Sequence, residues 1–233
     1  GRLGNIMANG RNKAPEAMLF DLDGTLFETE TISVPAYHAT FDHLRREGTY
    51  TGETPPVERF LGGLGLLLEQ IWARVLPDAG TDVIRRADEL MLHYQMEALR
   101  RGDGRLYPGV KETLQTLHAQ GIRLFVASNG LELYVKEVVR SAGIGHLFEG
   151  LYSAGEFQTR SKTDLVKLLL ERHGVRSAWM VGDRSSDVEA GHGNGLPVVG
   201  CKYAQFGKPG ELDKADMIIT AFPQLLDLID SGE

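Results

Sequence analysis

Six short runs of mostly apolar residues recur along the chain, separated by polar and glycine-containing stretches. Strands of a parallel sheet are covered on both faces, so near-continuous Val, Ile, Leu and Phe are typical of such strands. The pattern therefore predicts a mostly parallel sheet. The six predicted strands cover residues 17–23, 122–129, 151–154, 177–183, 197–201 and 216–220.

Amphipathic helical patterns lie between several of these runs. In one of them, Val110, Leu114 and Leu117 share a face, and the pattern ends at a glycine, as helices commonly do. Strands that alternate with short helices predict an α/β fold with a Rossmann-like core and right-handed crossovers. These predicted helices cover residues 109–121, 132–143 and 164–174.

The alternation is interrupted between residues 30 and 103, where successive helical patterns occur without a convincing strand. An all-helical block inserted after the first strand of an α/β unit predicts a small second domain. We therefore expect a core formed by residues 17–29 and 104–233, with a helical domain at 30–103. Residues 1–16 lack the apolar stretch of a secretory signal and are predicted to be a flexible leader.

Composition narrows the possible partners. The net charge is −7, and no run of Lys and Arg supplies the basic patch that nucleic acids or anionic membranes require. No apolar run is long enough to span a bilayer. The single cysteine, Cys201, excludes a disulfide within the chain and disfavours a thiolate zinc site. We expect a cytoplasmic protein, monomeric or homodimeric, that binds neither nucleic acid nor membrane.

Polar residues follow three of the predicted strands. Asp21 and Asp23 end the first strand, Ser128-Asn129-Gly130 ends the second, and Asp183 and Asp187 follow the strand at 177–183. In open parallel sheets, ligands bind outside the carboxyl ends of the strands. These side chains are therefore expected to converge on one crevice.

Three or more carboxylates gathered in a crevice repel one another unless a cation lies among them. A site with few carboxylates that retains several waters suits Mg²⁺, and such a site suits a phosphate ester. One aspartate could attack phosphorus to form an aspartyl phosphate. A second carboxyl two residues along the strand points to the same side and could act as general acid and base.

The motifs "DLDGT" (21–25), "SNG" (128–130), a lysine before a helix, and "GDRSSD" (182–187) occur in this order. Together they resemble the four motifs of the haloacid dehalogenase-like hydrolase superfamily. The helical insertion resembles the C1-type cap of that superfamily. The subgroup it most resembles contains phosphoglycolate phosphatases and β-phosphoglucomutases. The resemblance implies a Mg²⁺-dependent phosphatase acting on a small phosphorylated metabolite.

The resemblance also implies roles for the matching residues. Asp21 would be the nucleophile, and Asp23 would be the general acid and base and would offer its backbone carbonyl to Mg²⁺. Ser128, Asn129, Gly130 and Lys162 would bind the phosphoryl group, with Ser128 and Lys162 also counted as catalytic. Asp183 would be a metal ligand, and Asp187 would orient the metal shell or Lys162. The residues that match a role are Asp21, Asp23, Ser128, Asn129, Gly130, Lys162, Asp183 and Asp187.

Some alternatives stay open. Relatives commonly follow the motif lysine with proline, whereas Thr163 follows Lys162 here, and Arg160 is the alternative cation. A phosphomutase and a non-catalytic phosphate-binding protein are the competing functions. The sequence "GGLG" at 62–65 is expected to separate two cap helices near the substrate. Arg45, Arg59 and Trp72 could face the leaving group, but helical cap residues are more often core or solvated.

Overall fold

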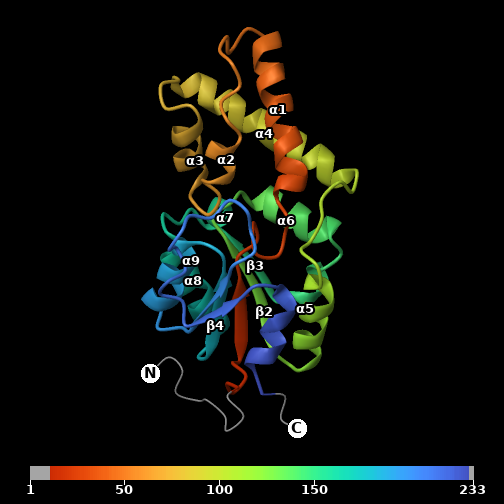
Figure 1. Cartoon of the computed structure of the whole chain (residues 1–233), viewed down its shortest axis with the longest axis vertical. Coiled ribbons are helices and arrows are strands. Elements are labelled where there is room, and N and C mark those ends of the chain that lie inside the picture. The colour runs from red at the N-terminus through yellow and green to blue at the C-terminus, as the bar shows by residue number, and fades with distance from the viewer. Residues whose placement is uncertain (1–10, 231–233) are drawn as a thin grey trace.

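The structure, a computed structural model, describes residues 11–230, and its centre is a six-stranded sheet in the order β3-β2-β1-β4-β5-β6 (Figure 1). Every neighbouring pair of strands is parallel. The predicted α/β fold with a parallel sheet is confirmed, and each predicted strand is present. The strands are β1 (Ala17–Phe20), β2 (Arg123–Ser128), β3 (Gly150–Ser153), β4 (Ala178–Gly182), β5 (Val198–Cys201) and β6 (Met217–Ile219).

The continuous apolar character of the strands reflects burial on both faces of the sheet. In β1, Met18 and Phe20 belong to one apolar cluster, whereas Ala17 and Leu19 belong to the other. Successive side chains of a strand point to opposite faces, so both faces require apolar residues. All four of these residues are fully buried.

Helices cover both faces of the sheet. On one face lie α5 (Val110–Ala119), α6 (Glu132–Ser141) and the short helix η2 (Phe222–Leu228), whereas α8 (Lys162–His173) and α9 (Ser185–Gly193) cover the other. The single-turn elements η1 (Gly145–Leu147) and α7 (Ala154–Phe157) flank β3. Glycines follow α5, α6 and α8, and each has a positive φ that a residue with a Cβ rarely adopts. They are Gly121, Gly143 and Gly174.

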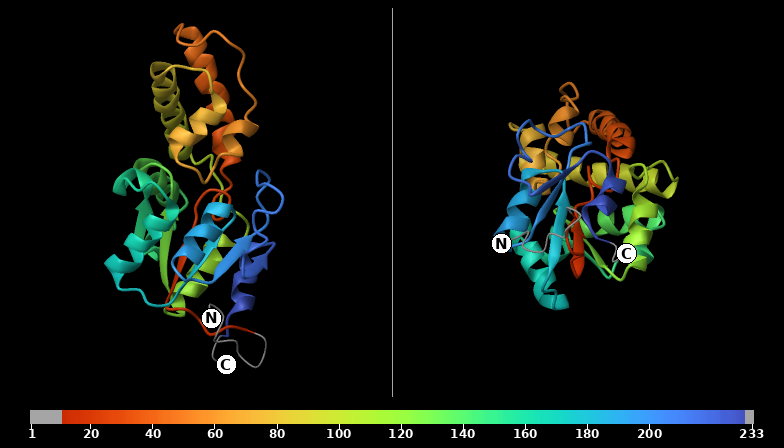
Figure 2. Two further views of the ribbon diagram at one scale, coloured as in Figure 1. Left: turned by 90° about the vertical axis from the view of Figure 1, so that its left-hand side faces the viewer. Right: turned by 60° about the horizontal axis from the view of Figure 1, so that its bottom comes forward.

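Residues 30–103, called the helical insert below, contain four helices and no strand of the sheet. Their apolar core includes Tyr37, Phe41, Phe60 and Trp72, separate from the two clusters on the sheet. Figure 1 and Figure 2 show these helices stacked above one end of the sheet. Their division into a separate domain stays a prediction. The helices are α1 (Glu30–Arg46), α2 (Glu58–Leu61), α3 (Leu68–Val75) and α4 (Thr81–Arg100).

The expected leader at 1–16 lies partly outside the described residues. Within the described part, Asn12 is held against the core: its backbone N–H donates to the carbonyl of Leu228 (2.9 Å), and the N–H of Asp230 donates to the Asn12 carbonyl (2.8 Å). Residues 11–16 therefore include an ordered contact with the C-terminal segment. No helix among residues 11–230 combines the length and apolar character needed to cross a membrane.

Candidate active site

The predicted residues meet where three adjacent strands end. Asp21 follows β1, Ser128 is the last residue of β2, and Asp183 follows β4. β1 lies between β2 and β4, so the strand order runs outward from β1 in opposite directions in the two halves of the sheet. Such a switch point opens a crevice at the carboxyl ends of the strands. The helical insert lies over this end of the sheet (Figure 2).

A buried carboxylate cluster lies at the switch point. Oxygens of Asp21, Asp183 and Asp187 all lie within 4.8 Å of one another. The Asp183 Oδ1 atom accepts a hydrogen bond from Thr25 Oγ1 (3.0 Å). The second oxygens of Asp21 and Asp183 are buried and have no hydrogen-bond partner. Burial, followed by the neighbouring charge of Asp21, raises the pKa of Asp183 well above its ordinary value.

Two buried acceptor oxygens that face a common space require a proton or a cation between them. The donor set consists of carboxylate oxygens only, which is the chemistry that Mg²⁺ and other hard divalent cations prefer. Asp21 and Asp183 therefore fit a divalent cation. A third oxygen donor is available from Asp187, which belongs to the same cluster.

Lys162 is the cation that the structure places in this cluster. Its Nζ donates to Asp21 Oδ1 (2.8 Å) and Asp187 Oδ1 (2.7 Å), and its side chain is 1% exposed. Burial alone lowers the pKa of a lysine, but the Asp187 and Asp21 carboxylates raise the pKa of Lys162 above its ordinary value. Arg160, the alternative cation, is largely exposed and pairs with Glu69.

Asp187 uses both of its carboxylate oxygens within the protein. Besides Lys162, it accepts hydrogen bonds from the backbone N–H groups of Asp183 and Arg184, both at 3.0 Å. Burial and the neighbouring Asp21 raise the pKa of Asp187 to about 6. These contacts let Asp187 hold the β4–α9 turn and the lysine in fixed positions.

Asp23 lies apart from the carboxylate cluster and has its own partners. Thr29 Oγ1 and Tyr134 Oη both donate to Asp23 Oδ1 at 2.6 Å. Burial raises the pKa of Asp23 to about 6, and the two hydrogen bonds oppose this rise. A buried carboxyl group with such a pKa exchanges a proton near neutral pH. Its side chain does not join the group of Asp21, Asp183 and Asp187.

The "SNG" motif forms the turn after β2. Ser128 Oγ accepts a hydrogen bond from the N–H of Gly130 (3.0 Å), so the hydroxyl shapes its own turn and does not cap α6. Asn129 Nδ2 donates to the carbonyl of Gly65 in the helical insert (2.9 Å). All three residues of the motif line the same pocket as Asp21 and Asp23.

The segment Gly62–Gly65 separates α2 from α3, as expected, and contacts the core. Arg184, at the start of α9, donates to the carbonyls of Leu64 and Gly62 (2.9 Å for Gly62). Its Nε also donates to Glu211 (3.0 Å). A buried guanidinium that bridges both parts of the chain fixes the position of this segment over the strand ends.

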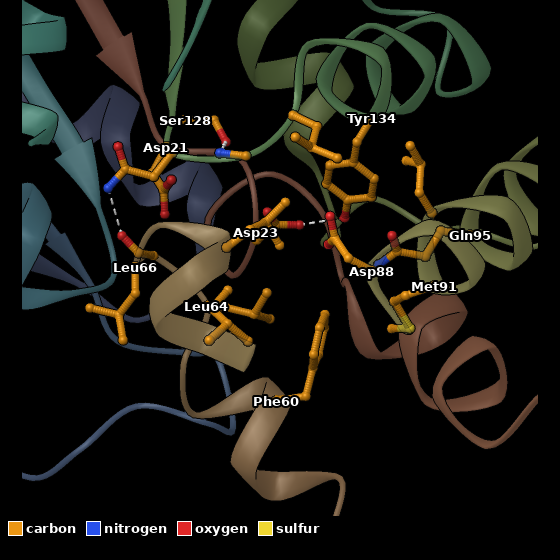
Figure 3. Close-up of a pocket in the computed structure, with 17 residues that line it drawn as sticks. Asp21, Asp23, Phe60, Leu64, Leu66, Asp88, Met91, Gln95, Ser128 and Tyr134 are labelled. Carbon is orange, nitrogen blue, oxygen red and sulfur yellow. Dashed lines mark hydrogen bonds between the residues drawn. The ribbon is translucent and has the colours of Figure 1, made fainter. Parts of the chain in front are cut away.

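A pocket extends from Asp21 and Asp23 into the helical insert (Figure 3). Figure 3 shows Asp21 and Ser128 at one side and Asp88 and Gln95, both from α4, at the other. Phe60, Leu64, Met91 and other apolar side chains form most of the wall between them. The site therefore combines a charged end at the sheet with a mostly apolar wall in the insert that also carries Asp88 and Gln95.

The suggested leaving-group residues Arg45, Arg59 and Trp72 do not line this pocket. Arg45 pairs with Asp42 at the surface, and the Trp72 indole donates to Asp88. Sequence reasoning also gave no role to Tyr134 and Arg184. A tyrosine on the apolar face of the helix after "SNG" was one usable signal, because a buried hydroxyl needs a partner.

Comparisons with known proteins show which family the chain resembles. Residues 18–201 match the family of haloacid dehalogenase-like hydrolases. The chain is 28% identical over 219 residues to a phosphoglycolate phosphatase of Vibrio vulnificus strain YJ016, covering 90% of this chain and 94% of the relative.

Solved structures share the fold. A predicted phosphoglycolate phosphatase from Haemophilus somnus superposes with a TM-score of 0.78 at 24% identity, covering 91% of this chain and 97% of the other. CbbY from Rhodobacter sphaeroides, in complex with phosphate, gives a TM-score of 0.76 at 24% identity and covers 91% and 96% of the two chains.

Proposed function

The chain belongs to the haloacid dehalogenase-like hydrolase family, and on that premise we propose that it is a Mg²⁺-dependent phosphatase. Its substrate would be a small-molecule phosphate monoester, hydrolysed through an aspartyl phosphate. The observation that carries the proposal is the pair of buried, unpartnered oxygens of Asp21 and Asp183 beside Lys162. The similarity to curated phosphoglycolate phosphatases supports it.

The residues at the site support a two-step reaction. Asp21 attacks phosphorus, and the ester bond to the leaving oxygen breaks while Asp23 gives that oxygen a proton. Asp23 then takes a proton from water, which attacks the phosphorus on Asp21 and releases inorganic phosphate. A pKa near 6 suits Asp23 for both roles. Thr29 and Tyr134 hold its carboxyl group in place.

Asp21, Asp183 and Asp187, with the backbone carbonyl of Asp23, would hold Mg²⁺. When bound, the ion supplies positive charge that neutralises the phosphoryl oxygens. Lys162 contributes a second positive charge next to Asp21. Ser128 and the N–H groups of its turn would contact the phosphoryl group. Cytoplasmic location and a monomeric or homodimeric state remain predictions.

We expect Mg²⁺ to stabilise the protein and EDTA to abolish its phosphatase activity. At about 100 times its Kd, a ligand that binds only the folded state adds about 2.7 kcal/mol to the free energy of unfolding. In Asp183→Asn this stabilisation should disappear, whereas without Mg²⁺ the variant should be more stable than wild type, because Asp21 no longer faces a buried carboxylate. Thermal denaturation with and without Mg²⁺ measures both effects.

Asp164→Asn is the matched control, because Asp164 is exposed at the start of α8. It should respond to Mg²⁺ as wild type does. An Asp183→Asn protein that Mg²⁺ stabilises as strongly as wild type would contradict the metal assignment.

The activity itself is tested by measuring phosphate release from p-nitrophenyl phosphate and a panel of phosphorylated metabolites with Mg²⁺. Release of free phosphate supports the proposal. Conversion of glucose 1-phosphate to glucose 6-phosphate without net phosphate release would identify a phosphomutase instead. Absence of both reactions across the panel would favour a binding protein.

Arg184→Met should lower kcat/KM by about 10- to 100-fold, because the Gly62–Gly65 segment would lose its fixed position over the strand ends. A small displacement of groups around a reacting centre lowers the reaction rate strongly. The substitution removes the hydrogen bonds to the Gly62 and Leu64 carbonyls and leaves Glu211 without its guanidinium. Steady-state kinetics on p-nitrophenyl phosphate would measure the effect.

Arg160→Gln is its control, because it likewise removes a contact between the core and the helical insert, here an ion pair with Glu69 at the exposed surface. Exposed ion pairs contribute little to the free energy of folding, so the helical insert should keep its position and kcat/KM should stay within about twofold of wild type. If kcat/KM fell equally in the two variants, the contacts of Arg184 with the Gly62–Gly65 segment would not be the cause of the loss.

A further inference from the structure

We propose that the leaving group of the substrate is an uncharged, largely apolar alcohol, and that Asp88 excludes esters whose leaving group carries a carboxylate. This inference rests on the proposed phosphatase function and names its substrate class. It follows from the composition of the pocket wall, from the absence of Lys, Arg and His among the described residues that line it, and from the fixed position of Asp88.

The wall of the pocket beyond the strand ends is mostly apolar. Most of it is formed by residues of α2, α3, α4 and the segment between α2 and α3, with Leu131 and Tyr134 from the core. Apolar side chains in such a wall favour apolar ligand atoms, at roughly 25 cal/mol for each Å² removed from water. A leaving group with a hydrocarbon body therefore fits this space. The apolar residues include Phe60, Leu64, Leu66, Ile71, Met91 and Leu92.

The charges on the wall are all acidic. Among the described residues that line the pocket, the ionisable ones with a carboxyl group are Asp21, Asp23 and Asp88, and none is Lys, Arg or His. Asp21 and Asp23 lie at the phosphoryl end, where Lys162 supplies positive charge. The far end offers only Asp88. A ligand carboxylate there would lose its water without gaining a cation.

Asp88 is held in place on this wall. Its Oδ1 accepts a hydrogen bond from Trp72 Nε1 (2.8 Å). Burial raises the pKa of Asp88, and the Trp72 hydrogen bond opposes that rise. Gln95, its neighbour on the same side of the pocket, donates to Ser33 Oγ (3.1 Å). The polar groups at this end are thus an acid and an amide, both anchored by side chains of the helical insert.

Arginines close to the pocket-lining residues in the sequence are directed elsewhere. Arg86, just before Asp88, pairs with Glu47 (2.8 Å). Arg59 donates to the Val75 carbonyl (3.5 Å), and Arg74 donates to the Arg59 carbonyl (3.2 Å). Neither lines the pocket. Phosphoglycolate, which the curated relatives are named for, carries a carboxylate on its leaving group. We therefore expect this chain to select a different ester from those relatives.

The test compares esters that differ by one carboxylate. With Mg²⁺ present, kcat/KM is measured for n-butyl phosphate and for 3-carboxypropyl phosphate, with phosphoglycolate alongside. The enzyme should prefer n-butyl phosphate, whose leaving group is uncharged, by at least about 30-fold in kcat/KM, because a buried, unpaired carboxylate on the leaving group is costly. Binding of the inert analogues n-butylphosphonate and 3-carboxypropylphosphonate, measured by titration calorimetry, should show the same order.

Asp88→Asn preserves the size of the side chain and an oxygen for Trp72, but removes the charge. It should reduce the preference for the neutral compound at least about fivefold. Asp82→Asn is the matched control, because its side chain is 98% exposed on the same helix. This variant should leave the preference unchanged.

The outcomes separate the two proposals. If wild type hydrolyses 3-carboxypropyl phosphate as well as n-butyl phosphate, or binds the two phosphonates equally, the substrate inference is wrong while the phosphatase proposal stands. If Asp88→Asn and Asp82→Asn reduced the preference for n-butyl phosphate equally, the substrate inference would also be wrong. If no ester is hydrolysed but n-butylphosphonate still binds more tightly, the phosphatase proposal fails and the selectivity of the pocket stands. Without hydrolysis or binding, both are wrong.

Discussion

Asp21→Asn is expected to reduce phosphate release by at least about 10⁴-fold, because loss of a nucleophile removes the covalent route entirely. An amide keeps the shape of the side chain, and its oxygen can still accept the hydrogen bond from Lys162 (2.8 Å in the wild type). Its oxygen is too weak a nucleophile to take the phosphoryl group from the substrate and form an aspartyl phosphate. The measurement is kcat for p-nitrophenyl phosphate with saturating Mg²⁺.

Trapping the intermediate distinguishes a nucleophile from a mere metal ligand. Wild-type protein mixed with a ³²P-labelled phosphate ester and quenched in acid should carry label on Asp21, whereas Asp21→Asn should carry none. Asp164→Asn, an exposed aspartate converted in the same way, should keep both the label and the wild-type kcat. Turnover by Asp21→Asn within tenfold of wild type would refute the mechanism.

The residues at the strand ends could be predicted because their signal is local. Asp21, Ser128 and Asp183 each follow directly after an apolar run, and the parallel topology fixes that all three runs end at the same edge. No knowledge of side-chain packing is needed for this step. The fold class follows from the same pattern, because each strand must be apolar on both faces.

The sequence left Arg160 open as an alternative to Lys162 because Thr163, and not proline, follows the lysine. The helix that carries Lys162 also begins two residues earlier than the predicted range 164–174. The Ser161 side chain accepts a hydrogen bond from the N–H of Asp164 and begins α8 at Lys162. This cap places the lysine in the first helical turn, buried against the carboxylates. A serine followed three residues later by an acid is a usable signal for such a start.

Contacts between the helical insert and the core could not be predicted from the sequence. Arg184 acquires its position only when the Gly62–Gly65 segment is placed over the sheet, and Asp88 acquires its position only when α3 and α4 pack against each other. Both depend on long-range packing. Each residue alone resembles an ordinary surface charge on a helix. Their burial and partners, Leu64 and Trp72 among them, are properties of the assembled fold.

Lys162→Met should lower the free energy of unfolding by about 3–5 kcal/mol, the usual cost of removing one partner from a buried ion pair. Lys162 has a side chain that is 1% exposed and contacts both Asp21 and Asp187. Methionine fills a similar volume, so the loss arises mainly from leaving these carboxylates without the cation. Urea denaturation without Mg²⁺ measures the change.

Mg²⁺ should then stabilise Lys162→Met more than it stabilises wild type, because the ion replaces the positive charge that Lys162 gives to Asp21 and Asp187. Phosphatase activity should nevertheless stay at least about 100-fold below wild type, since the charge next to Asp21 is lost in the transition state. Lys167→Met, an exposed lysine of the same helix α8, is the control and should match wild type in all three measurements. If Mg²⁺ stabilised Lys162→Met no more than wild type, the lysine and the metal would not share the same carboxylates, and the electrostatic basis of the site would be wrong.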